Sequence, residues 1–203
     1  MKKAITHLKK SDAILAAIIE RAGAYKIRYA EPGFQTLVRS IVSQQLNGRA
    51  ADTIFGRLQA AAKAEPMTPE SILKLRPAKM RSLGLSGQKM TYIRELARMT
   101  RSGEVNFEQC AGLEDGAVVE HLTRVKGVGV WTVHMFLMFA LRRHNVLPVG
   151  DLGIRMAMKK AYGLEEMPKP EEMERIAAPW RPYSSVACWY LWRSLEVKSQ
   201  EPE

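Results

Sequence analysis

Between residues 122 and 153, two glycines, a lysine and a lone aspartate have a spacing that suits phosphate binding beside a carboxylate. Residues 125–129, Val-Lys-Gly-Val-Gly, separate two apolar helical patterns, so one helix would end in a glycine hairpin and the next would begin at once. The hairpin leaves backbone N–H groups without partners in either helix, and such donors bind phosphate. Isolated glycines more often only end and begin helices. Here the acid that follows at a fixed distance favours a functional interpretation.

Asp151 is that acid. It follows Leu147-Pro-Val-Gly150, which restricts and then bends the chain, and it precedes an apolar helical pattern that starts at Leu152. Aspartate is a preferred N-cap residue, so capping alone would explain it. A cap is compatible with catalysis, because the first-turn amides stabilise a negative charge there.

Composition and length restrict the class of protein. The 203 residues favour one compact body with two lobes, and the formal net charge of +10 suits a polyanion such as nucleic acid. The two cysteines, Cys110 and Cys188, are too few for an iron–sulfur cluster and have no zinc-type spacing, so we expect reduced, buried thiols. The first residues lack a long apolar run, and we expect neither a signal peptide nor a membrane span.

Apolar residues recur at helical spacing almost throughout, whereas alternating strand patterns are scarce, which predicts an all-α fold. Glycine, proline and capping residues set the expected ends of the helices. The expected helices cover residues 12–21, 34–46, 50–63, 90–100, 115–124, 130–142, 152–162, 170–177 and 184–197, with a further start at 68–70 and a frayed polar tail from Lys198.

The motifs together resemble the helix-hairpin-helix DNA glycosylase superfamily (HhH-GPD), specifically its 3-methyladenine DNA glycosylase II branch. The segments that carry the resemblance are Lys126-Gly-Val-Gly-Val-Trp-Thr132, Met135-Phe-Leu-Met-Phe139, Asp151-Leu-Gly-Ile-Arg155, Ser43-Gln-Gln-Leu46, Gly84-Leu-Ser-Gly-Gln-Lys89 with Tyr92-Ile93, and Trp180-Arg-Pro-Tyr183 with the helix that follows it.

The resemblance implies a bilobal all-α fold with a helix-hairpin-helix motif and an inter-lobe cleft. We expect a single domain over residues 1–203, with lobes of roughly 35–117 and of 1–34 plus 118–203. It also implies that a nucleotide is flipped out of the duplex and that its base–sugar bond is then cleaved. Asp151, the acidic residue of the motif, would supply the catalytic carboxylate.

The resemblance also assigns the remaining site residues, each with a simpler alternative. The base pocket would use Trp131, Tyr183, Met135 and His134, although aromatic residues often only fill a core and a core histidine is the commoner case. Many relatives have a basic residue after this tyrosine, whereas Ser184 stands here. We expect Trp180, Trp189, Tyr190 and Trp192 in the core.

The predicted DNA contacts lie on the hairpin and on a second glycine turn. They are Lys126, Gly127, Val128, Gly129, Thr132, Gly87 and Lys89. Lys89 would hold a phosphate, or would simply be a solvated lysine in the first turn of a helix. Gln45 and Leu46 would form the wedge that fills the gap left by the flipped base, with helix core as the alternative for Leu46.

Trp131 predicts both the reaction type and the lesion. Strand-cutting members of the superfamily carry a lysine at this position, which forms a Schiff base, and its absence predicts a monofunctional enzyme that uses water. N-alkylated purines are cationic and already have a weakened glycosidic bond. An indole face attracts such a cation by about 0.5–2 kcal/mol, whereas a lysine would repel it.

We therefore expect a base-excision repair glycosylase that removes 3-methyladenine, with 7-methylguanine as a second candidate. The alternatives are a non-catalytic DNA-binding module, a glycosylase for deaminated or oxidised bases, and, least favoured, a helical scaffold. We expect double-stranded DNA with alkylated bases as partner, no membrane, a monomer, and a place in the cytoplasm or nucleoid, or in the nucleus of a eukaryote. We expect no cofactor and no catalytic metal; the resemblance allows a monovalent cation at the hairpin carbonyls.

The residue at position 131 yields a first testable prediction. Sodium borohydride should trap no covalent adduct between the protein and DNA that carries the lesion, because tryptophan has no amine to form a Schiff base. A strand-cutting glycosylase serves as positive control on the same gel. A borohydride-dependent adduct of this protein would contradict the assignment.

Overall fold

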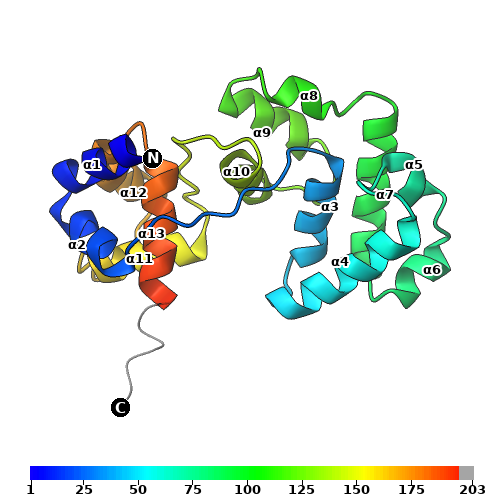
Figure 1. The fold of residues 1–203 in the computed structure, drawn as a ribbon, viewed down its shortest axis with the longest axis horizontal. Helices are drawn as coiled ribbons and strands as arrows, with labels where there is room; N and C mark the ends of the chain where they lie inside the picture. The colour runs from blue at the N-terminus through cyan, green and yellow to red at the C-terminus, as the bar shows by residue number, and fades with distance from the viewer. Residues whose placement is uncertain (197–203) are drawn as a thin grey trace, which may run out of the picture. The chain divides into compact units, whose positions relative to one another are not determined.

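The structure is a computed structural model that describes residues 1–196, and these residues form helices without a strand (Figure 1). This confirms the predicted all-α fold. The helices are α1 (Lys2–Ser11), α2 (Ala13–Ala22), α3 (Phe34–Ser43), α4 (Gly48–Ala62), α5 (Pro69–Leu73), α6 (Pro77–Ser82), α7 (Gly87–Arg101), α8 (Phe107–Cys110), α9 (Asp115–Thr123), α10 (Val130–Phe139), α11 (Leu152–Ala161), α12 (Pro170–Ala177), the 3₁₀ helix η1 (Ala178–Trp180) and α13 (Ser184–Glu196).

Some predicted helix ends differ from the observed ones. The helix expected over 34–46 ends at Ser43, and the helix expected over 130–142 ends at Phe139. In the second case the chain turns at Arg142, which has a φ of 57°. Helix α1 was not predicted, because only Ala4 and Leu8 of its ten residues are buried. The predicted tail from Lys198 lies outside the described residues.

The chain divides into two compact units. The first comprises residues 1–29 and the residues from 137 onward, and the second comprises residues 30–136. The division falls within α10. The lobe expected over residues 35–117 lies inside the second unit, which also contains the glycine hairpin.

In the first unit, helix α2 packs against α1 and α13, and α11 packs against α13. The Asp12 carboxylate links three parts of this unit by hydrogen bonds. One of its carboxylate oxygens caps α2 by accepting from the backbone N–H of Leu15 at 2.9 Å. The other accepts from the Tyr162 hydroxyl at 2.5 Å and from Nε1 of the buried Trp180 at 2.8 Å. Burial, and then the hydrogen bond to Asp12, raise the pKa of Tyr162, so its hydroxyl remains a donor.

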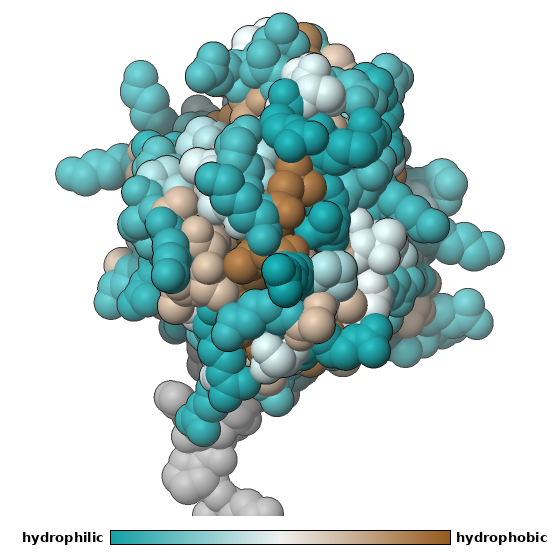
Figure 2. All heavy atoms as spheres, turned by 90° about the vertical axis from the view of Figure 1, so that its right-hand side faces the viewer, coloured by the Kyte–Doolittle hydropathy of each residue, from teal (hydrophilic) through white to brown (hydrophobic). Residues whose placement is uncertain are grey.

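In the second unit, helix α3 packs against α4 and α7, and α5 packs against α7. Fully buried aliphatic side chains fill the space between these helices, and each contributes about 1.5–3 kcal/mol through burial. They include Leu37, Ile41, Leu58, Ile93 and Leu96. The outer face of this unit is mainly hydrophilic, with a narrow hydrophobic strip between the polar side chains (Figure 2).

None of the helices in residues 1–196 combines the length and apolar character that crossing a membrane requires.

The Asp12 network predicts a stability effect. Asp12→Ala removes a helix cap, worth about 0.5–2 kcal/mol, and leaves the buried Trp180 N–H and the half-buried Tyr162 hydroxyl without their acceptor, at about 1–3 kcal/mol. We expect the free energy of unfolding to fall by about 2–4 kcal/mol in urea titrations. Glu20→Ala is the control, because its ion pair with Lys9 is exposed and such pairs contribute about 0–1 kcal/mol. Equal midpoints for Asp12→Ala and the parent would refute this role.

Candidate active site and nucleic-acid interface

The glycine hairpin forms as predicted from the sequence. Helix α9 ends at Thr123, and two tight turns follow, in which Val125 N–H donates to the Leu122 carbonyl at 3.1 Å and Val128 N–H to the Val125 carbonyl at 3.0 Å. Helix α10 then begins at Val130. The first-turn N–H groups of α10 have no acceptor within the helix, so this end carries the donors and the positive dipole that attract an anion.

Gly127 is required at its position for two independent reasons. Its φ of +88° lies in the left-handed region that disfavours side chains. A β-carbon at residue 127 would also lie 2.0 Å from Cδ2 of the Tyr92 ring, which is impossible without displacing the ring. Tyr92, on α7, therefore supports the hairpin directly. It lies in a segment that carries the family resemblance, but the sequence analysis predicted no role for it. At Gly129, by contrast, no such obstacle exists.

The predicted wedge lies in a corner formed by residues 44–47, between α3 and α4. Gln45 has a φ of 58°, and Asn47 caps α4 by accepting from the Ala50 N–H at 2.9 Å. Leu46 is 38% exposed and belongs to no helix, so the alternative that it is helix core is wrong. Its role as a wedge remains a prediction.

Lys89 has a role that the sequence did not reveal. Its ammonium donates to the carbonyls of Val42 and Gln44, both at 2.7 Å. Burial lowers the pKa of this lysine, and the side chain is half-buried rather than solvated. The Gln44 side chain in turn donates from Nε2 to the Gly127 carbonyl at 2.9 Å. The structure thus brings together the corner, Lys89 and the hairpin within the second unit.

The predicted residues of α10 differ in exposure. Trp131 is 45% exposed, so it is not a core residue, whereas Thr132 is only 3% exposed. The side chain of Thr132 is therefore not on the surface, and a DNA contact from this residue would have to come from the main chain. His134 and Met135 are half-buried. Burial lowers the pKa of His134 against the opposing effect of Asp115, which keeps the imidazole mainly neutral near pH 7.

Asp151 caps α11 as predicted, and its side chain is held firmly. Oδ1 accepts from the backbone N–H of Ile154 at 2.7 Å and from Nε1 of Trp192 at 2.9 Å, and the residue is 7% exposed. A β-carbon at position 153 would lie 3.1 Å from both Oδ1 and the Trp192 ring, so Gly153 permits this close approach. The expectation that Trp192 belongs to the core is wrong, because the ring is half-buried and its N–H binds the carboxylate.

The other predicted core aromatics, Trp180, Trp189 and Tyr190, are buried as expected. Cys110 and Cys188 are free, buried thiols, also as expected. Cys188 lies close to the Asp151 carboxylate: burial, with a contribution from the negative charge of Asp151, raises the pKa of its thiol. The thiol therefore remains neutral.

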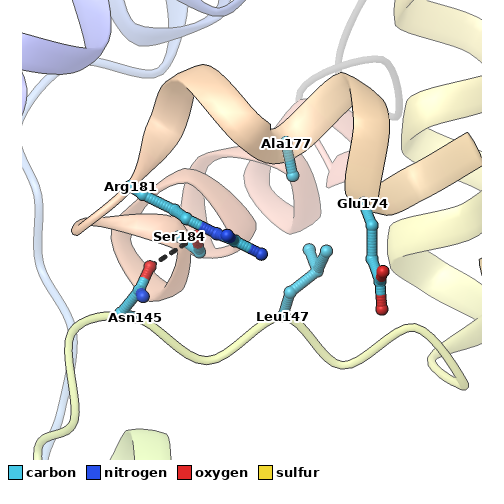
Figure 3. Close-up of a pocket in the computed structure, with 6 residues that line it drawn as sticks. All are labelled: Asn145, Leu147, Glu174, Ala177, Arg181 and Ser184. Carbon is cyan, nitrogen blue, oxygen red and sulfur yellow. Dashed lines mark hydrogen bonds between the residues drawn. The ribbon is translucent and has the colours of Figure 1, made fainter. Parts of the chain in front are cut away.

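Helix α13 also fixes the segment that leads to Asp151. Its first two residues, Ser184 and Ser185, bind this segment through side chains and main chain. Ser185 Oγ donates to the Arg143 carbonyl at 2.7 Å and accepts from the Val146 N–H at 2.9 Å. The Ser185 N–H donates to the His144 carbonyl at 2.9 Å. Ser184 Oγ donates to Asn145 Oδ1 at 2.9 Å (Figure 3). Ser184 is 3% exposed, so the residue after Tyr183 has a structural role here.

A pocket of about 180 Å³ lies beside this segment in the first unit (Figure 3). It is lined by Asn145, Leu147, Glu174, Ala177, Arg181 and Ser184, none of which was predicted as a site residue. Tyr183 is half-buried in the same unit, with its ring 5.4 Å from that of His7 in an edge-on arrangement.

The hairpin, the carboxylate that caps α11 and the corner after α3 are all present, and comparison with known proteins shows what they belong to. The family described as "HhH-GPD superfamily base excision DNA repair protein" matches residues 38–182. The chain belongs to this superfamily.

Individual relatives span nearly the whole chain. DNA-3-methyladenine glycosylase 1 of Schizosaccharomyces pombe is 32% identical and is aligned over 97% of this chain and 89% of its own length. The solved structure of the S. pombe 3-methyladenine DNA glycosylase Mag1 in complex with abasic DNA matches with a TM-score of 0.88 at 30% identity, over 98% of this chain and 100% of that one. The solved structure of a DNA-3-methyladenine glycosidase from Bacillus halodurans matches with a TM-score of 0.86 at 35% identity, over 98% of this chain and 91% of that one.

The contact between Gly127 and Tyr92 predicts the effect of a single methyl group. Gly127→Ala should distort the hairpin, because a β-carbon cannot fit against the ring and the left-handed φ costs about a further 1–2 kcal/mol. The hairpin amides are the predicted phosphate contacts, so we expect affinity for undamaged duplex to fall about tenfold or more, measured by fluorescence anisotropy.

Gly116→Ala, on α9, is the matched control, since no atom lies within 4 Å of an added β-carbon there. Its affinity should equal that of the parent. Parental affinity in Gly127→Ala would show that the hairpin does not contribute to DNA binding.

Proposed function

We propose that this protein is a monofunctional DNA glycosylase that hydrolyses the N-glycosidic bond of N-alkylated purines in duplex DNA and leaves an abasic site. The observation that carries the proposal is the nearly buried carboxylate of Asp151, fixed by the Ile154 N–H and Trp192 Nε1 in a chain of the HhH-GPD superfamily. The substrate class is that named for its relatives from S. pombe and B. halodurans.

DNA binding begins at the hairpin. The first-turn N–H groups of α10 and the turn before them hold a backbone phosphate, and Lys126 adds positive charge. The formal net charge of +10 raises the rate of encounter with DNA, and it makes the affinity depend on salt. These interactions hold the backbone without reading the sequence.

Base removal needs the target nucleotide out of the stack. Unstacking costs a few kcal/mol, and less for a damaged pair. Leu46 and Gln45, exposed at the corner after α3, enter the duplex and occupy the space that the nucleotide leaves.

Asp151 acts on the sugar. Loss of the base leaves an oxocarbenium-like carbon, and a carboxylate about 4 Å away contributes about 4 kcal/mol at an effective dielectric constant near 20, which is about a thousandfold in rate. If the same carboxylate also orients or deprotonates the attacking water, general-base catalysis adds about a hundredfold. Because its Oδ1 already accepts two N–H donors, the orientation of the carboxylate is set before substrate arrives.

The lesion is selected by charge. Trp131, exposed on α10, offers an indole face to the cationic base, and Tyr183 is the second proposed wall. His134 remains mainly neutral near pH 7, so at this position it does not repel a cationic purine.

A monovalent cation at the hairpin would strengthen phosphate binding. The carbonyl of Val125 accepts the Val128 N–H within the turn, and a carbonyl oxygen has two lone pairs, so this group can also coordinate an ion. We further propose that the protein acts as a monomer and works where the cell keeps its DNA, in the bacterial nucleoid or the eukaryotic nucleus. Neither an organic cofactor nor a catalytic metal enters this mechanism.

Base release decides between this function and a binding module. Incubation with randomly methylated DNA, followed by chromatography, should yield free 3-methyladenine and 7-methylguanine. Asp151→Asn should bind DNA as the parent does but lose about a thousandfold in single-turnover excision, because the amide has no negative charge. Glu174→Gln, an exposed carboxylate in the same unit, is the control with parental excision.

Two outcomes would refute the proposal. If the parent frees no base from methylated DNA but binds it, the protein is a binding module or acts on other lesions, such as deaminated or oxidised bases. If Asp151→Asn cuts at the parental rate, the catalytic residue lies elsewhere.

A further inference from the structure

The corner of residues 44–47 has a few local hydrogen bonds: the Leu46 N–H donates to the Ser43 carbonyl at 3.1 Å, and Asn47 caps α4. It lies between the end of α3 and the start of α4, and within it Gln45 adopts a left-handed φ of 58°. Such a conformation is unfavourable for a residue with a side chain. The exposed Leu46 can act as a wedge only if the backbone of the corner is rigid. A mobile backbone would let the side chain move aside instead of separating the stacked bases.

Lys89 supplies part of that rigidity. The last carbonyls of a helix have no N–H partner within it, and the carbonyls of Val42 and Gln44 at the end of α3 are of this kind. The Lys89 ammonium binds both at 2.7 Å, and its charge opposes the negative end of the helix dipole. The two hydrogen bonds from this charged donor hold Val42 and Gln44, and Gln44 immediately precedes Gln45.

Gln44 supplies the second constraint. Its Nε2 donates to the carbonyl of Gly127 at 2.9 Å, so the corner is bonded to the hairpin that we propose binds phosphate. Gly127 in turn lies against Tyr92, which is on α7, the helix that carries Lys89. Corner, hairpin and α7 therefore form a closed ring of contacts within the second unit.

We propose that Lys89 and Gln44 are positioning residues that fix the wedge at a constant offset from the hairpin phosphate site. This inference rests on the proposed wedge function of Gln45 and Leu46. Capture of the backbone by the hairpin then places Leu46 opposite a defined base step, and the energy of phosphate binding is used to open that step. Because two of its three N–H donors bind the corner, Lys89 acts through the corner, and the salt dependence below tests whether the third donor binds a phosphate.

The test compares two substrates. One is a duplex with a single 7-methylguanine, and the other has the same lesion in a short unpaired bubble, where no wedge is needed. Lys89→Met keeps the unbranched stem but removes the donors. We expect single-turnover excision from the duplex to fall about tenfold or more, since hydrogen bonds to charged groups contribute about 1.5–3 kcal/mol, and to fall less than about threefold in the bubble.

Salt dependence separates positioning from phosphate contact. The slope of log affinity against log salt concentration should be the same for Lys89→Met and the parent. A slope smaller by about one would show that Lys89 binds a phosphate and would overturn the inference. Lys3→Met, an exposed lysine on α1, controls for the loss of one positive charge and should match the parent on both substrates.

Further variants keep the test decisive. Gln44→Met removes the bond to the hairpin and should reproduce the duplex-specific loss, which covers the case that Lys89→Met does not fold. Leu46→Ala should show the same loss, and combining it with Lys89→Met should add little. Equal losses on both substrates, or parental excision from the duplex, would overturn the positioning role.

The outcomes also distinguish failure of this inference from failure of the two proposals on which it rests, the wedge role of Leu46 and the glycosylase activity. If Leu46→Ala keeps parental duplex excision, Leu46 is not the wedge, and the inference fails with it. If the parent releases base from neither substrate, the proposed activity on 7-methylguanine fails first.

Discussion

A nearly buried negative charge needs fixed hydrogen-bond donors, and the first unit is arranged to provide them for Asp151. Burying a carboxylate without partners is very costly, so its donors must be in place in the folded protein. The start of α11 provides one at Ile154, and α13 provides the other through Trp192. Gly153 leaves the space for the indole to approach, and Phe139 stacks on its other side with ring centroids 5.9 Å apart. Rotation of the carboxylate would break both bonds, so its direction is set by packing.

The second unit solves a different problem, that of presenting main-chain groups. The proposed phosphate-binding amides and the proposed wedge both depend on backbone geometry, which side-chain burial alone does not fix. The structure uses contacts to carbonyls instead: Lys89 binds two at the end of α3, and Gln44 binds one in the hairpin. Tyr92 then restricts the hairpin to a path that only glycine at position 127 can follow.

The sequence predicted the features that depend on local residue pattern. It did not predict the hydrogen bonds between residues that are far apart in the chain. Helical periodicity gave the fold class and most helices, and glycine spacing gave the hairpin. The cap at Asp151 followed from residue type. The bond from Trp192 to Asp151 spans 41 residues and that from Lys89 to Gln44 spans 45, and nothing in the local pattern of either pair indicates it. Trp192 was therefore placed in the core, and Lys89 was expected on a phosphate or in solvent.

The hydrogen bonds at Asp151 also bear on which lesions such a site can process. Two N–H donors on Oδ1 are the kind of partners that a negatively charged carboxylate requires. A neutral, undamaged purine leaves slowly without protonation, whereas an N-alkylated purine already carries the positive charge that protonation would supply. For such a base, stabilisation of the sugar cation by a fixed anion, the role proposed for Asp151, is sufficient. The role proposed for Asp151 therefore suits alkylated purines for a physical reason that is independent of the shape of the pocket.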